Sequence, residues 1–196
     1  MFEYEKKYID LGHTLIAGAD EVGRGPLAGC VTVCAIIPSF TKIIDGVNDS
    51  KKLSDKKRRA LYPYIIENAI AVNIATRSEK IIDEINILRA TEQAFTEALN
   101  GLNPLPTVAL LDAVKLRGLP CISESIIHGD ALSYSVACAS IVAKVTRDDY
   151  MRTAAELYPE YGFERNMGYG TAEHIAALKK YGPCPIHRRS FIKNFI

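Results

Sequence analysis

The sequence contains no tryptophan, few histidines and methionines, and almost no net charge. Its 24 basic residues are balanced by 23 acidic residues, which gives a formal net charge of +1. A domain that binds nucleic acid usually carries a strong positive charge. The composition therefore gives no sign of such binding, although basic residues gathered on one face would still permit it.

Long apolar runs are also missing. The longest, around residues 30–37, has the length of a strand and falls far short of the ~20 residues of a membrane span. The first ten residues carry several charges and no apolar signal core, so we expect a cytoplasmic protein without export or membrane contact. A chain of 196 residues predicts a single domain, with a helical C-terminal extension over about residues 160–196. We also expect a monomer.

The five cysteines include no C-x-x-C pair; they are Cys30, Cys34, Cys121, Cys138 and Cys184. An odd number without metal-site spacing indicates reduced, mostly buried thiols. Cys30 and Cys34 would share one face of a strand, but no neighbouring histidine completes a zinc site.

The hydrophobic pattern predicts an α/β fold. The expected strands are Ile16–Ala19, Cys30–Ile37, Ala69–Thr76, Thr107–Leu111 and Cys121–Ile127. The expected helices are Asp55–Asn68, bent or broken at Pro63, a long helix from Ser78 to Asn100, and the helices Leu132–Tyr158 and Ala172–Tyr181. Three early strands should pair antiparallel, and two later strands should add in parallel. The prediction is a mixed five-stranded sheet flanked by helices.

Four acidic residues lie at the ends of these strands. Asp20 and Glu21 follow the first strand, Asp112 ends the fourth, and Asp130 lies just beyond the fifth. Adjacent ionised carboxylates away from water cost several kcal/mol unless they are paired or bind a metal. If the strands are neighbours, the acids meet and suit two divalent cations ~3.5–4 Å apart, which could cleave a phosphodiester. The alternative is that they are ordinary turn and cap residues.

The segment Gly23-Arg24-Gly25 predicts a turn with free N–H groups beside a forked guanidinium, an arrangement that binds anions. A dinucleotide-binding loop is excluded, because the spacing is not G-x-G-x-x-G and a strand follows. A tight hairpin turn alone would explain the same residues. Tyr169 lies between two glycines, so we expect it to be exposed and able to stack on a sugar or base.

Basic residues form two groups along the chain. The first group is Lys51, Lys52, Lys56, Lys57, Arg58 and Arg59, and the second is His187, Arg188, Arg189 and Lys193. Each group is either a solvated face or a surface that holds a polyanion beside the acids.

Together these residues resemble the ribonuclease HII family. The resemblance rests on blocks spread over almost the whole chain: AGADEVGRGPLAG (17–29), NDSKKLS (48–54), LDAVKL (111–116), IIHGDALS (126–133), ASIVAKVTRD (139–148), YPEYGF (158–163), GYGTAEH (168–174) and HRRSF (187–191). It implies a ribonuclease H-like fold and hydrolysis of the RNA strand of RNA–DNA hybrids with Mn²⁺ or Mg²⁺. It also implies nicking 5′ to a ribonucleotide embedded in duplex DNA, which leaves a 3′-hydroxyl and a 5′-phosphate.

The resemblance also implies roles for particular residues. The residues that match the family's catalytic, metal-binding acids are Asp20, Glu21, Asp112 and Asp130. Those that match its substrate contacts are Gly23, Arg24 and Gly25, at the 2′-hydroxyl and adjacent phosphate, and Tyr169, at the RNA–DNA junction; Lys51 and Lys52 are further candidates for substrate contact. Three residues depart from the family pattern: His128 replaces a common lysine, and Asn166-Met167 replace a usual His-Lys. With less positive charge near the substrate, we expect the affinity for substrate and the metal preference to differ from the family pattern.

Two other functions remain open. A resolvase- or transposase-type nuclease can share the sheet and the acids but cuts a duplex made only of DNA. A nucleic-acid-binding module would keep the acids for structural reasons and would show no metal-dependent hydrolysis.

Overall fold

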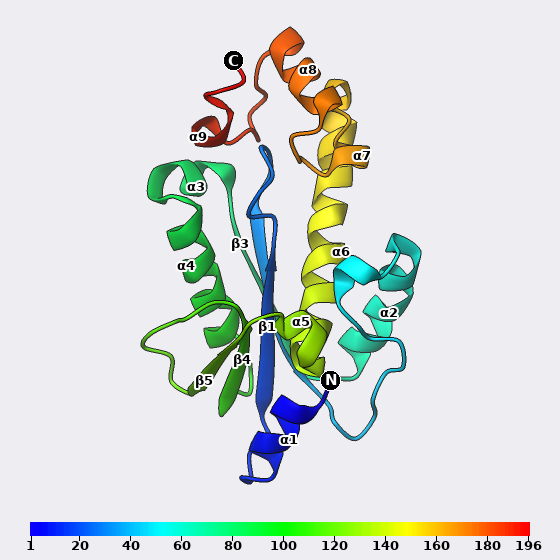
Figure 1. Cartoon of the computed structure of the whole chain (residues 1–196), viewed down its shortest axis with the longest axis vertical. Coiled ribbons are helices and arrows are strands. Elements are labelled where there is room, and N and C mark those ends of the chain that lie inside the picture. Colours follow the sequence, from blue (N-terminus) through cyan, green and yellow to red (C-terminus); the bar gives the residue numbers. More distant parts are fainter.

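A five-stranded sheet runs through the centre of the computed structural model, which describes residues 1–196 (Figure 1). The strands are β1 (Ile16–Val22), β2 (Val31–Pro38), β3 (Ala69–Arg77), β4 (Val108–Asp112) and β5 (Ile122–Ile126), in the spatial order β3-β2-β1-β4-β5. The pairs β1–β2 and β2–β3 are antiparallel, whereas β4 lies parallel to β1 and β5 parallel to β4. The predicted mixed sheet is confirmed.

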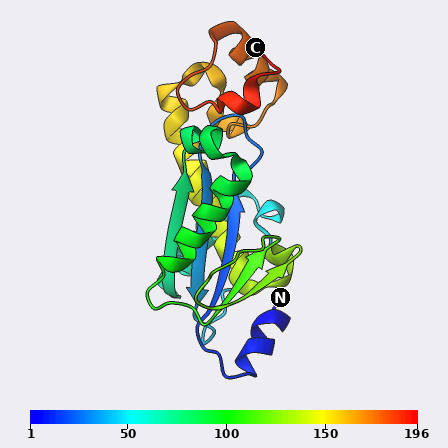
Figure 2. The ribbon, with the colours of Figure 1, turned by 90° about the vertical axis from the view of Figure 1, so that its left-hand side faces the viewer.

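Helices cover both faces of the sheet. They are α1 (Glu3–Ile9), α2 (Asp55–Glu67), α3 (Glu79–Ile85), α4 (Ile87–Asn100), α5 (Gly129–Leu132), α6 (Tyr134–Leu157), α7 (Phe163–Asn166), α8 (Ala172–Tyr181) and α9 (Arg189–Ile192), with short 3₁₀ turns at Ser50–Lys52 and Pro159–Tyr161. Helix α4 lies on one face, α6 and α2 lie on the other, and α7 to α9 gather beyond the far end of α6 (Figures 1 and 2). None of the helices combines the length and the apolar character that crossing a membrane requires.

Two apolar layers hold the helices against the sheet. The layer under α4 includes Phe95 and Leu99, and the layer under α6 includes Ile36 and Ile141. The approach of α6 to β1 is so close that a Cβ atom on Gly18 would lie 2.1 Å from the carbonyl carbon of Ser135. The start of α6 is therefore fixed directly over the middle of β1, next to the segment that carries the acids.

The structure corrects several predicted boundaries. Strand β1 does not end at Ala19 but continues through both acids, because its hairpin with β2 extends to the pair Val22–Thr32. Pro63 does not break α2. A proline removes one backbone hydrogen bond, and we attribute the continuity of α2 to Ile65, which packs in the apolar layer under α6.

One long predicted helix is divided by a polar residue, and another begins at Tyr134 rather than at Leu132. Asn86 separates α3 from α4: it has φ 69°, and its side chain accepts a hydrogen bond from Arg89 N–H at 3.1 Å. Ser133 separates α5 from α6, and its hydroxyl caps α6 by accepting from Val136 N–H at 3.2 Å. Helix α1 was not predicted. The five cysteines are free, and all except Cys121 are buried, as expected.

Candidate active site

Three aspartates from distant parts of the chain converge at one end of β1. One carboxylate oxygen from each of Asp20, Asp112 and Asp130 lies within 4.8 Å of the other two. Strands β1 and β4 are parallel neighbours, so their carboxyl ends bring Asp20 and Asp112 to the same edge of the sheet. Asp112 Oδ1 accepts a hydrogen bond from Gly129 N–H at 2.7 Å, which draws the start of α5 and Asp130 to that edge. The predicted meeting of these three acids is confirmed.

The aspartate cluster carries more negative charge than the protein neutralises. Burial raises the pKa of Asp20 well above its ordinary value, and the charges of Glu21 and Asp112 raise it further. Burial also raises the pKa of Asp112, against the opposing effect of the Gly129 N–H. The one ion pair is from Lys51, whose Nζ lies 3.2 Å from Asp130 Oδ2. Oxygen ligands with uncompensated charge suit a hard divalent cation, so these residues fit Mn²⁺ or Mg²⁺.

Glu21 lies outside the three-oxygen cluster. Successive side chains of a strand point to opposite faces, so Glu21 faces the α4 side of β1 and Asp20 faces the α6 side. Burial raises the pKa of Glu21, the charge of Arg24 lowers it, and Asp112 raises it. The charge of Asp112 therefore raises the pKa of both Asp20 and Glu21. A ligand at the sheet edge could meet carboxylates from both faces of β1.

The Gly-Arg-Gly turn (residues 23–25) and the turn that carries Tyr169 (residues 166–170, the tyrosine turn) lie against each other. Gly23 adopts φ +94°, Arg24 and Gly25 are exposed, and Arg24 Nη1 lies 3.4 Å from Glu21 Oε1. Leu27 N–H donates to the carbonyl of Gly168 at 2.8 Å, immediately before Tyr169. A Cβ atom on Gly25 would lie 3.8 Å from the ring of Tyr169, which is 44% exposed as predicted. Both turns thus open toward the same side of the site.

The two basic groups differ from the predicted surfaces. Lys51 reaches the aspartates, whereas Lys52 pairs with Asp49 at 3.8 Å. Arg58 is buried and donates to the carbonyls of the turn that carries both lysines, including that of Ser50 at 2.8 Å. In the C-terminal group, His187 and Arg188 are almost fully buried, at 1% and 0% exposure. Neither alternative, a solvated face or a surface that holds a polyanion, is correct for these two residues.

The residues that depart from the family pattern have local structural roles. His128 adopts φ 60° at the start of α5. Asn166 is buried: its amide donates to the carbonyl of Tyr161 at 2.7 Å, and its oxygen accepts from Gly168 N–H at 2.8 Å. Asn166 therefore shapes the backbone turn that presents Tyr169.

Three residues near the site were missed by the sequence reasoning: Ser140, Arg147 and Arg188. The Ser140 hydroxyl lowers the pKa of Asp20, and it shares a 2.7 Å hydrogen bond with Ser50. Arg147 could have been noticed, because it stands four residues after Ala143 on the small-residue face of the predicted helix. A charge on that face indicates a buried polar role.

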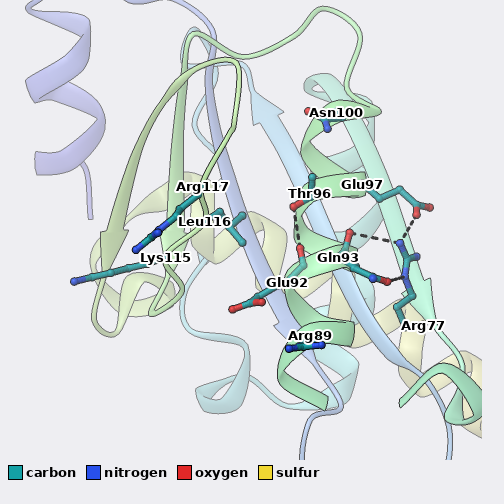
Figure 3. A pocket seen from close by; sticks show the side chains of 10 residues that line it. All are labelled: Arg77, Arg89, Glu92, Gln93, Thr96, Glu97, Asn100, Lys115, Leu116 and Arg117. Atoms are coloured by element: carbon teal, nitrogen blue, oxygen red, sulfur yellow. Dashed lines mark hydrogen bonds and ion pairs between the residues drawn. The ribbon is translucent and has the colours of Figure 1, made fainter. Parts of the chain in front are cut away.

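A hollow lies along α4, and none of the three aspartates lines it (Figure 3). It has a volume of about 700 Å³. Lys115 and Arg117 line the side opposite α4, and on the side of α4 Arg77 is paired with Glu97 at 2.6 Å. A second hollow, of about 430 Å³, shares Glu92 and Lys115 with the first and includes Glu21 and Arg24. The surface beside Glu21 is thus continuous with a groove along α4.

A mixed five-stranded sheet with a buried and a half-buried aspartate at the ends of two parallel neighbours defines a nuclease of the ribonuclease H-like class. Comparison with known proteins gives the particular family. The family description ribonuclease HII matches residues 17–194. The chain belongs to the ribonuclease HII family, and it is an endonuclease of the ribonuclease H type.

Individual relatives agree with this assignment. The chain is 52% identical to ribonuclease HII of Acetivibrio thermocellus over 98% of this chain and 75% of that protein. It is 49% identical to ribonuclease HII of Caldicellulosiruptor bescii over 100% of this chain and 95% of the relative.

Solved structures share the fold. Ribonuclease H2 from Pyrococcus horikoshii OT3 aligns with a TM-score of 0.75 and 29% identity over 89% of this chain and 92% of that one. Bst-RNase HIII, solved in complex with Mn²⁺, aligns with a TM-score of 0.67 and 18% identity over 87% of this chain and 64% of that one.

Proposed function

We propose that the protein hydrolyses the RNA strand of RNA–DNA hybrids and nicks duplex DNA 5′ to an embedded ribonucleotide, with Asp20, Glu21, Asp112 and Asp130 as its catalytic acids. The observation that carries the assignment of the acids is the convergence of three carboxylates within 4.8 Å at the sheet edge. Family membership supports the substrate class. We further propose that the protein acts as a monomer in the cytoplasm.

The four acids would hold Mn²⁺ or Mg²⁺, which would supply an activated water and stabilise the leaving oxygen. The chain itself contributes the orientation of the ligands. The Glu21 N–H, which donates at 2.7 Å, orients the Asp20 carboxylate, and the Gly129 N–H orients Asp112. The Lys51 ammonium beside Asp130 is 77% exposed and could contact a substrate phosphate. Bst-RNase HIII, which was solved with Mn²⁺, supports a divalent cation here.

The substrate would be read by the two turns beside the acids. The 2′-hydroxyl is the group that distinguishes RNA from DNA. We propose that the Gly23-Arg24-Gly25 turn contacts this hydroxyl and the adjacent phosphate, and that Tyr169 packs at the junction with the following deoxynucleotide. The exposure of Arg24, Gly25 and Tyr169 on one side of the site supports this assignment. Cleavage would leave a 3′-hydroxyl and a 5′-phosphate.

The direct test is nicking of a duplex that contains one ribonucleotide, under Mg²⁺ and under Mn²⁺, with products read at nucleotide resolution. Wild type should cut once, on the 5′ side of the ribonucleotide. Asp20→Asn should lose nearly all cleavage while remaining folded, because a ligand loses its charge. Asp10→Asn, a change at the exposed acid that follows α1, is the matched control and should cut normally.

Three results would overturn the proposal. Near-normal turnover by Asp20→Asn would remove the aspartate cluster from the chemistry. Cleavage of a matched duplex made only of DNA would favour a resolvase-type nuclease, and binding without any metal-dependent cleavage would favour a structural role for the acids.

A further inference from the structure

Two arginines are buried behind the Gly-Arg-Gly turn. Arg147 of α6 and Arg188, just before α9, are both 0% exposed. Each donates to three backbone carbonyls. Arg188 donates from Nε to the carbonyl of Gly29 at 2.9 Å, from Nη1 to that of Arg24 at 2.9 Å, and from Nη2 to that of Gly23 at 2.5 Å. Arg147 bonds the carbonyls of Cys30, Met167 and Ala28 at 2.9, 3.0 and 3.1 Å.

The contacts of Arg188 fix the direction of two peptide groups. In a trans peptide the C=O and the following N–H point in opposite directions. The Gly23 and Arg24 carbonyls point inward to Arg188, so the N–H groups of Arg24 and Gly25 point away from it. Neither N–H has an acceptor within the protein, and the next residue, Pro26, has no N–H at all. Two adjacent donors are thus presented outward on a braced turn.

We propose that Arg188 is a positioning residue for substrate recognition: it holds the Gly23 and Arg24 carbonyls inward, so that the Arg24 and Gly25 N–H groups are aimed at the ribonucleotide before it binds. This inference rests on the proposed function, because it takes the Gly-Arg-Gly turn as the reader of the 2′-hydroxyl and its phosphate. Arg188 itself never touches the substrate, since it is fully buried.

An arginine suits this role and a lysine does not. A guanidinium presents donors in a rigid planar fork, whereas an ammonium is a compact charge on a flexible stem. Burial and the charge of Arg147 lower the pKa of Arg188 to about 10, so it stays protonated at neutral pH. A lysine could keep the charge but could not hold three carbonyls in the same plane.

The hydrogen bonds of Arg188 and Arg147 also extend to the tyrosine turn. Arg188 N–H donates to the carbonyl of Leu27 at 2.8 Å, and Leu27 N–H donates to Gly168 at 2.8 Å. Arg147 donates to the carbonyl of Met167, the residue before Gly168. A shift of the Gly-Arg-Gly turn would therefore also move Tyr169.

The test compares wild type, Arg188→Lys and the control Arg165→Lys, which makes the same change at an exposed arginine of the C-terminal segment. Cleavage kinetics are measured on the single-ribonucleotide duplex, and melting curves report folding. Binding is measured in Ca²⁺ buffer by fluorescence anisotropy, on that duplex and on the matched all-DNA duplex. Arg188→Lys should lose ~100-fold in kcat/KM, because a small misplacement of positioning groups has effects of this size. Its preference for the ribonucleotide duplex in binding should disappear, while its affinity for all-DNA duplex stays unchanged.

Cleavage by wild type in the same assay tests the proposed function by itself. A failure of the proposed function can therefore be distinguished from a failure of the positioning role. A folded Arg188→Lys with the wild-type preference in binding would overturn the positioning role. If Arg188→Lys does not fold, Arg188→Gln replaces it in the same measurements. Loss of folding in both variants would also overturn the proposal, because the guanidinium would then hold the fold rather than orient the turn.

Discussion

At the scale of single residues, Gly23 and Gly25 differ in what requires a glycine: the fold at Gly23, and a bound ligand at Gly25. Gly23 has a positive φ, and a Cβ there would lie 2.2 Å from Arg147 Nε, so the fold itself requires glycine. At Gly25 the φ is ordinary, and the nearest atom to an added Cβ is in the Tyr169 ring, at normal contact distance. Only a ligand close to the backbone would require glycine at that position.

We therefore predict that Gly25→Ala folds normally but loses ~100-fold in kcat/KM on a single-ribonucleotide duplex, because the methyl group displaces the substrate from the turn. Thermal melting should match wild type within about 2 °C, as for surface substitutions that change stability by less than ~0.5 kcal/mol. Unchanged cleavage by a folded Gly25→Ala would show that the substrate does not approach this backbone.

A buried histidine pair supports the tyrosine turn. His187 Nδ1 accepts from Cys184 N–H at 3.0 Å, so its proton lies on Nε2, which faces His174 Nε2 at 3.0 Å. His174 then carries its own proton on Nδ1 and donates to the carbonyl of Tyr169 at 2.8 Å. Burial lowers the pKa of His174, and burial together with the charge of His174 lowers the pKa of His187 to about 4. Both rings are neutral links in one chain of hydrogen bonds.

This pair predicts a loss of stability in acid. The folded-state pKa of His187 lies below the unfolded value of ~6.5, so the unfolded state binds more protons between these values. The stabilising contribution of neutral His187 is therefore complete above about pH 6.5 and falls as the pH drops toward 4. In urea titrations across this range, the unfolding free energy of His187→Gln should depend less steeply on pH than that of wild type. The difference in slope should correspond to up to about one fewer proton taken up on unfolding. Equal slopes in the two proteins would contradict the assignment.

At the scale of elements, α1 closes the start of α6 from a distant part of the sequence. Glu5 is 0% exposed, and its Oε1 accepts from Ser135 N–H at 2.9 Å and from the hydroxyls of Ser133 and Ser135 at 2.5 and 2.7 Å. A carboxylate at a helix N-terminus interacts favourably with the helix dipole. This contact holds the first turns of α6, and hence Ser140, over Asp20.

We predict that Glu5→Gln lowers the unfolding free energy by about 1–3 kcal/mol, the usual value for a lost charged hydrogen bond. Glu3→Gln, an exposed change on the same helix, should leave stability unchanged. Urea unfolding of both variants measures the difference. Equal midpoints for Glu5→Gln and wild type would show that the capping contact contributes nothing.

The elements that the sequence predicted are those with a strong local pattern. The β-branched run of β2, the apolar run of β4, the regular apolar spacing of α4 and the small residues of α6 report burial directly. Helix α1 was missed because its role depends on Glu5 reaching α6, about 130 residues away in the chain. The division of the long helix at Asn86 depends on one backbone angle, which periodicity does not report.

At the scale of the whole molecule, the strand order determines the site. Because β4 lies beside β1 in parallel, Asp20 and Asp112 become neighbours, and this meeting followed from the predicted sheet. The bracing of the turns could not be predicted in the same way. Arg188 appeared in a basic run typical of a surface, and only the packing of the C-terminal segment against residues 23–30 buries it. Roles that depend on burial by a distant segment leave little trace in local sequence.

The most direct test of the central claim is the binding of Mn²⁺ to the free protein, measured by isothermal titration calorimetry. We predict that wild type binds Mn²⁺ through the aspartate cluster, and that Asp20→Asn and Asp112→Asn each weaken binding by at least about tenfold. Asp10→Asn should bind as wild type does. Wild-type affinity for Mn²⁺ in a folded Asp20→Asn protein would contradict the claim that the converging aspartates form the metal site.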